Sequence, residues 1–140
     1  ALPIWPAFRE KEKEAVKSLS EKGLCVVATG GGVILSEDNR NLLKKLGVVV
    51  YLKASLHDIL DRLSRDAKDE QTRPQFTSGT LVDETVAVLT DRLPLYESTA
   101  DFTVDTEGKS VVRVADEIYE YLLETGTIAE IKNLKKRLKQ

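Results

Sequence analysis

The chain is poor in cysteine, in long apolar runs and in net charge, and each shortage excludes a class of protein. Cys25 is the single cysteine, so no internal disulfide can form. The longest apolar runs are far shorter than the roughly 20 residues that a membrane-spanning helix needs. The net charge of −2 gives no indication of a nucleic-acid partner. These features predict a cytoplasmic protein that binds neither membranes nor nucleic acid, with Cys25 as a buried, unreactive thiol.

Two chemical features are absent as well. No segment matches G-x-x-x-x-G-K-[ST], the loop whose backbone amides and lysine hold nucleotide phosphates. His57 is the only histidine, and its place beside Asp58 at an expected helix start predicts a solvent-facing side chain rather than a catalytic base. The sequence therefore contains neither a phosphate-binding loop nor an evident general base.

The apolar pattern of the 140 residues alternates between extended and helical segments, which is typical of a single α/β domain. Buried strands are expected at residues 24–28, 48–52 and 102–104. Helices are expected around residues 8–23, 36–47, 55–63, 82–93 and 111–122, with a mobile polar loop at 66–80. Strands that alternate with helices predict three αβα layers, in which the three strands are neighbours in a parallel sheet.

The two ends of the chain differ from the domain between them. Residues 1–7 include Pro3 and Pro6 and have no periodicity, so we interpret them as a lead-in that is non-native or disordered. Residues 8–126 form the domain. Residues 127–140 combine apolar side chains at helical spacing with five cations, which predicts a short basic helix added to the fold: Lys132, Lys135, Lys136, Arg137 and Lys139.

Three consecutive glycines are the first candidate site. Gly30, Gly31 and Gly32 follow the expected strand at 24–28, at a place where the backbone has reason to approach a ligand closely. A plain turn is the alternative for an isolated triplet. The glycines become informative because Arg9 precedes Gly31 by 22 residues.

Arginines at fixed distances are the second candidate. Guanidinium groups bind carboxylates with paired hydrogen bonds and keep their charge in a partly dry cleft, which makes Arg9 and Arg92 candidates for holding an acid. Solvated surface arginines are the alternative. Glu12 lies three residues after Arg9 on the apolar side of the expected helix, so we predict that it pairs with Arg9.

These residues occur in motifs that together resemble one family, shikimate kinase, from about residue 8 to residue 124. The motifs are Phe8-Arg9, the glycine triplet, Arg73-Pro74 and Arg92-Leu93-Pro94-Leu95-Tyr96. The resemblance implies a P-loop kinase fold of the nucleoside-monophosphate-kinase type. It also implies that ATP, with Mg²⁺, phosphorylates the 3-hydroxyl of shikimate in aromatic amino acid (chorismate) biosynthesis.

The resemblance also indicates what is missing. In the family a first strand, the phosphate loop and an aspartate base precede the residues that match here. We therefore expect a fragment truncated at its N-terminus, with one sheet position vacant, no metal ligand of its own, poor stability and no turnover. The expected small-molecule partners are shikimate and ATP, and the expected state is a monomer.

The family's residue roles carry over to matching positions. Arg9, Arg92 and the glycines, above all Gly31, would bind shikimate, with Glu12 orienting Arg9. Arg73 would be the catalytic arginine of a lid and would contact the transferring phosphates, although Gln75 and Phe76 replace the usual leucines after it. Two further cations match positions near the adenine of ATP: Arg62 and Lys109.

Two other functions remain open from the residues. One is a non-catalytic, shikimate-kinase-like domain that binds a small acid as part of a regulator. The other is a different small P-loop kinase, acting on gluconate or a nucleotide. A pure sensor would have no need of the lid arginine, Arg73, and the Arg92-Leu93-Pro94-Leu95-Tyr96 motif argues against the other kinases.

Overall fold

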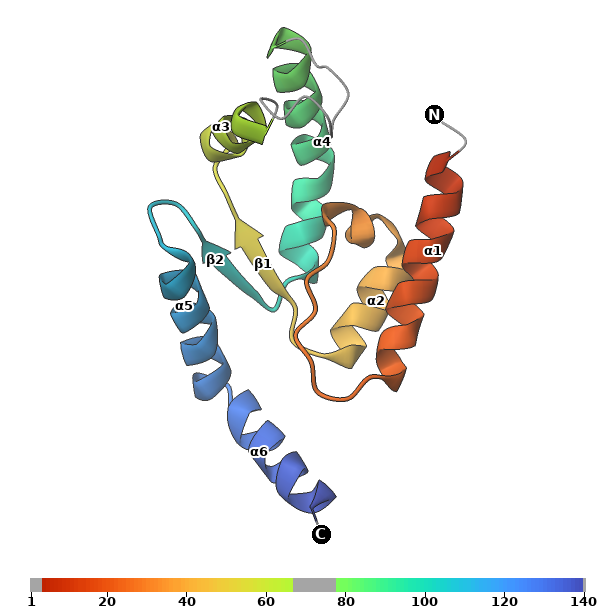
Figure 1. Cartoon of the computed structure of the whole chain (residues 1–140), viewed down its shortest axis with the longest axis vertical. Coiled ribbons are helices and arrows are strands. Elements are labelled where there is room, and N and C mark those ends of the chain that lie inside the picture. Colours follow the sequence, from red (N-terminus) through yellow and green to blue (C-terminus); the bar gives the residue numbers. More distant parts are fainter. Residues whose placement is uncertain (1–3, 67–77, 140) are drawn as a thin grey trace.

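The computed structural model of the chain describes residues 4–66 and 78–139. In these two ranges a two-stranded sheet is surrounded by helices (Figure 1). The elements in chain order are α1 (Ile4–Ser18), η1 (Leu19–Glu21), η2 (Gly31–Leu35), α2 (Glu37–Leu46), β1 (Val50–Lys53), α3 (Leu56–Asp66), α4 (Ser78–Thr99), β2 (Phe102–Asp105), α5 (Val111–Glu124) and α6 (Thr127–Leu138), where η denotes a 3₁₀ helix.

The sheet consists of β1 and β2, which run parallel, as predicted, with Val50 opposite Phe102 and Lys53 opposite Asp105. The entry to both strands is fixed by Asp101, whose carboxylate accepts a 2.7 Å hydrogen bond from the Val49 amide. Helices α3 and α4 form the long crossover that a parallel pair requires. Val104 on β2 is 1% exposed, so the sheet has a buried face despite its small size.

The strand expected at residues 24–28 is not formed, which corrects the prediction from the sequence. This segment is irregular, and Val26 is fully exposed. Within the described residues the sheet has the order β1–β2, and no backbone hydrogen bond joins residues 24–29 to either strand. β-Branched side chains favour an extended backbone, but a strand forms only where a neighbour supplies the ladder. Cys25, which was expected to be buried, is exposed for the same reason.

The first helix begins earlier than the expected boundary of the domain. α1 begins at Ile4, so residues 4–7 are helical rather than part of an unstructured lead-in. Pro6 fits there because the first turn of a helix leaves its amides unpaired. The ring of Trp5 meets that of Phe8 edge to face at 6.0 Å, and Cζ of Arg9 lies 5.7 Å from the centre of the Trp5 ring. These contacts tie the first turn to a candidate site residue.

The core lies around η2. Val16 of α1 packs with Val33 and Ile34 of η2, and each is at most 5% exposed. Partly buried side chains of α2 and α4 complete the cluster: Leu42, Leu43, Leu95 and Tyr96. The segment that follows the glycines is therefore the most enclosed part of the described chain.

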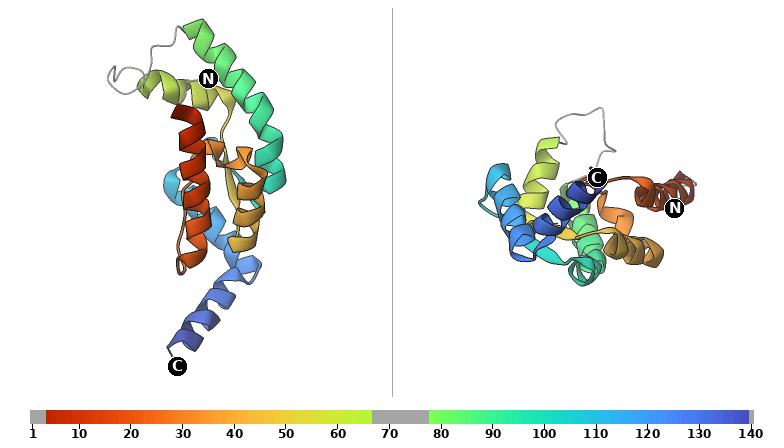
Figure 2. Two further views of the ribbon diagram at one scale, coloured as in Figure 1. Left: turned by 90° about the vertical axis from the view of Figure 1, so that its right-hand side faces the viewer. Right: turned by 90° about the horizontal axis from the view of Figure 1, so that it is seen from below.

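The two C-terminal helices differ in how they attach to the rest of the molecule. α5 packs on β2 through stacked rings of Phe102 and Tyr121, whose centres are 4.3 Å apart. Gly126, in the left-handed region with φ 77°, then breaks the helix before α6. Figures 1 and 2 show α6 extending beyond the sheet and the other helices. Within the described residues, no helix combines the length and apolar character needed to cross a membrane.

Candidate binding site

The glycine triplet forms the turn that begins η2, and its three positions are not equivalent. Gly30 is extended, and a Cβ there would meet nothing within 4 Å. A Cβ on Gly31 would lie 2.9 Å from the hydroxyl of Tyr96. A Cβ on Gly32 would lie 2.9 Å from Cζ of Arg9 and closer still to its terminal nitrogens. A side chain at position 31 or 32 would therefore displace the Tyr96 hydroxyl or the Arg9 guanidinium from its present place, whereas one at position 30 would displace nothing.

Arg9 reaches the turn from α1. Its guanidinium donates a 2.9 Å hydrogen bond to the carboxylate of Glu12, one helical turn later, which confirms the predicted pair. The Glu12 side chain is 13% exposed and that of Arg9 is 29% exposed, so the pair is partly shielded from water. The rings of Trp5 and Phe8 lie beside the guanidinium on the same helix. Arg9 is therefore held in one orientation against Gly32.

Arg92 reaches the turn from α4. Its Nη1 lies 3.7 Å from the position that a Cβ on Gly31 would take. Among the described residues, no carboxylate forms an ion pair with Arg92, in contrast to Arg9. Two guanidinium groups, from residues more than 80 positions apart in the sequence, therefore lie beside adjacent glycines. Arg9 is paired with Glu12, so Arg92 is the arginine whose charge is available for an anion.

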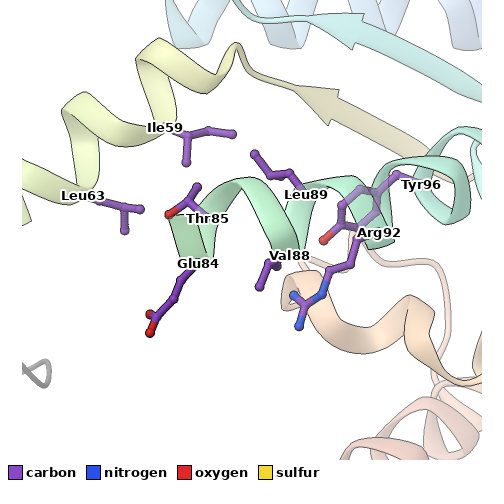
Figure 3. Close-up of a pocket in the computed structure, with 8 residues that line it drawn as sticks. All are labelled: Ile59, Leu63, Glu84, Thr85, Val88, Leu89, Arg92 and Tyr96. Atoms are coloured by element: carbon purple, nitrogen blue, oxygen red, sulfur yellow. The ribbon is translucent and has the colours of Figure 1, made fainter. Parts of the chain in front are cut away.

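A cavity of about 320 Å³ adjoins Arg92 between α3 and α4 (Figure 3). Apolar side chains form most of its wall, and Arg92 and Tyr96 lie at one end, on the same side of α4. Its lining consists of Ile59, Leu63, Glu84, Thr85, Val88, Leu89, Arg92 and Tyr96. α3 starts three residues after β1 ends, so the cavity lies beyond the carboxyl end of a strand, where open α/β sheets bind ligands. Arg9 is not part of the lining.

Tyr96 is a residue of the site to which sequence reasoning gave no role. Its hydroxyl donates a 2.8 Å hydrogen bond to the carbonyl oxygen of Gly31. Its ring stacks on Tyr51 of β1, with ring centres 5.1 Å apart. Burial, with smaller contributions from Tyr96 and Glu97, raises the pKa of Tyr51. The spacing of four from Arg92 on one helix was the signal that could have identified Tyr96.

Two side chains of α2 hold the turn from the other side, and they too were missed. The amide group of Asn39, which is 3% exposed, donates to the Val33 carbonyl at 3.1 Å. Arg40 donates to the Ile34 carbonyl at 2.6 Å. Ser36 caps α2 by accepting from the Asn39 amide, which sets the register of both side chains.

The remaining candidates lie apart from this cluster or outside the described residues. Arg73 belongs to residues 67–77, which the structure does not describe. Arg62 is exposed on α3, and the amino group of Lys109 is paired with Glu117 at 3.0 Å. Neither lines the cavity. The side chain of His57 is 90% exposed, as expected of a solvent-facing residue.

Among the described residues, potential metal ligands are not clustered. Within residues 4–66 and 78–139, no three His, Cys, Asp or Glu side chains are grouped so that they could hold a metal ion. Mg²⁺ in kinases is held by one or two protein oxygens together with nucleotide phosphates and waters, an arrangement that does not need such a group. The chemistry of the described site is that of arginine, backbone amide and hydroxyl groups.

Comparisons with known proteins agree on one family. The family model described as shikimate kinase matches residues 3–123. A shikimate kinase of Syntrophus aciditrophicus is 38% identical over 122 residues, covering 81% of this chain and 63% of the relative. One of Geobacter metallireducens is 41% identical over 117 residues, covering 84% and 63%.

Solved structures give the same result. The structure of shikimate kinase from Acinetobacter baumannii in complex with shikimate has a TM-score of 0.71 at 30% identity, covering 86% of this chain and 65% of that chain. Shikimate kinase from Bacteroides thetaiotaomicron has a TM-score of 0.70 at 25% identity, covering 86% and 69%. The chain thus spans a little under two thirds of the length of the curated relatives described above.

Proposed function

The chain belongs to the shikimate kinase family and has its α/β P-loop kinase fold, and from this premise we propose that the glycine turn with Arg9 and Arg92 binds shikimate. The observation that supports the proposal is the position of two guanidinium groups against the adjacent residues Gly31 and Gly32. A carboxylate is well matched by guanidinium donors in a partly shielded site.

The two arginines have different roles in this proposal. Arg92 has no carboxylate partner among the described residues, so its charge is available to the shikimate carboxylate. Arg9 is oriented by Glu12 and provides the second set of donors beside Gly32. Gly31 has no side chain, so a substrate hydroxyl can approach its backbone without meeting a Cβ.

The proposed reaction is transfer of a phosphoryl group from ATP to the 3-hydroxyl of shikimate. Such transfer depends mainly on positioning and on positive charge around the phosphates. Arg73 is proposed to supply that charge from a lid, and Arg62 and Lys109 to lie near the adenine. Lys109 would have to exchange its contact with Glu117 for one with the nucleotide.

The chain by itself is proposed to bind shikimate without turnover. Its 140 residues contain no G-x-x-x-x-G-K-[ST] motif. They therefore lack the loop amides and the lysine that hold the ATP phosphates in P-loop enzymes. The second candidate is a small-acid-binding regulatory domain, which would use the acid site of Arg9 and Arg92 without transferring a phosphoryl group. Weak binding of ATP together with tight binding of shikimate by a natural full-length protein would support that alternative.

Isothermal titration of the chain with shikimate tests the proposed site. Arg92→Ala removes charged hydrogen bonds worth about 1.5–3 kcal/mol, so Kd should rise about 10- to 150-fold. Arg137→Ala, on the exposed helix α6, is the matched control and should leave Kd unchanged. Equal affinity of the Arg92→Ala variant and the wild type would contradict the assignment.

A further inference from the structure

The hydrogen bond between Tyr96 and Gly31 joins residues 65 positions apart in the sequence. It connects the helix that carries Arg92 to the backbone that Arg92 faces. We propose that Tyr96 is a positioning residue, which holds the peptide group of Gly31 in the orientation that the ligand requires. The inference rests on the proposed function, because the ligand in question is the acid bound by Arg92.

Peptide geometry explains why one carbonyl matters. The carbonyl of Gly31 and the amide N–H of Gly32 belong to the same planar trans peptide group, so fixing one direction fixes the other. The Gly32 N–H lies in the turn that Arg9 and Arg92 approach. The Tyr96 hydroxyl thereby sets the direction of a donor beside Arg9.

Glycines need such an external restraint because they lack the Cβ that limits other residues. Further along η2, the carbonyls of Val33 and Ile34 are held by Asn39 and Arg40 of α2. Among the described residues, Tyr96 is the side chain that provides the equivalent contact at the glycines themselves.

The same helix also sets the distance between arginine and glycine. Arg92 and Tyr96 are one turn apart on α4, and both lie within 4 Å of a Cβ placed on Gly31. A movement of α4 would therefore carry the guanidinium and the hydroxyl together. The Tyr51 stack fixes the Tyr96 ring without using its hydroxyl, so the two contributions are separable by mutation.

The test compares Tyr96→Phe with Tyr51→Phe. Each variant loses one hydroxyl and keeps the stacked rings, but the Tyr96 hydroxyl alone contacts Gly31. In the ligand-free chain, Tyr96→Phe should shift the ¹H–¹⁵N signals of Gly31 and Gly32 and speed their hydrogen exchange. With shikimate, Kd should rise about 3- to 10-fold, the usual range for a net hydrogen bond. Tyr51→Phe should change neither measurement.

A double-mutant cycle distinguishes positioning from general stability. In the Arg92→Ala background, Tyr96→Phe should weaken shikimate binding less than in the wild type, because the two residues act on one ligand. Gly31→Ala, whose Cβ would displace the Tyr96 hydroxyl, should reproduce the effect from the other side of the contact.

The outcomes separate the two proposals. If wild type does not bind shikimate, the proposed function fails, and the glycine amide signals still decide whether Tyr96 holds the turn. If Tyr96→Phe leaves those signals and Kd unchanged, the positioning role is overturned. Equal losses of thermal stability and affinity in Tyr96→Phe and Tyr51→Phe would also overturn it, since they would indicate ring packing alone.

Discussion

At the scale of single residues, the site depends on the lack of a side chain at Gly31 and Gly32. Gly31 and Gly32 leave room for the Tyr96 hydroxyl and the Arg9 guanidinium, whereas Gly30 has open space around it. The triplet looks uniform in sequence, yet its members have different tolerances. Replacing each glycine in turn by alanine, which adds one methyl group, tests that difference.

Gly32→Ala should displace the Arg9 guanidinium, because the new Cβ would lie 2.9 Å from Cζ. Because the guanidinium is the movable end of a long, partly exposed side chain, the free energy of unfolding should fall by less than about 1 kcal/mol, whereas shikimate affinity should fall as Arg9 leaves its place. Urea denaturation and calorimetric titration measure the two effects. Gly30→Ala is the control and should behave as wild type; equal behaviour of both variants would mean that Arg9 does not depend on the glycine.

At the scale of elements, three helices converge on one short turn. α1 supplies Arg9, α2 supplies Asn39 and α4 supplies Tyr96, and each contacts a different residue of η2. The turn thus has little freedom, although it begins with glycines. The buried member of this set is Asn39, so the attachment of α2 is the most sensitive to mutation.

Asn39→Ala should leave the Val33 carbonyl without its side-chain donor in a buried place. The expected loss is about 1–3 kcal/mol in the free energy of unfolding. Asn41→Ala, on the exposed face of the same helix, is the matched control and should change stability by less than about 0.5 kcal/mol. Chemical denaturation gives both values, and a small effect at position 39 would show that the contact is dispensable.

At the scale of the whole molecule, the parallel pairing of β1 with β2 and the positions of the helices could be predicted, because apolar periodicity and caps such as Ser36 are local signals. The Arg9–Glu12 pair was predictable for the same reason. The fate of residues 24–28 was not, because strand formation depends on a neighbour that no local pattern reveals. Nor did any pattern indicate that Tyr96 would meet a carbonyl 65 residues away.

Mutation of residues 24–28 can distinguish an exposed, irregular segment from a buried strand. Val26→Asp should change the free energy of unfolding by less than about 0.5 kcal/mol, since the side chain is fully exposed. Val104→Ala, at a position 1% exposed, should cost about 1.5–3 kcal/mol. A large loss from Val26→Asp in urea denaturation would indicate that the segment is buried as a strand.

The exposed thiol of Cys25 has a practical consequence. Because it is the only cysteine in the chain, a maleimide dye would attach at a single place without any mutation. That place lies six residues before Gly31, on the segment that leads into the turn. A change in the fluorescence of such a dye on addition of small acids would allow mixtures of them to be screened against the unmodified sequence.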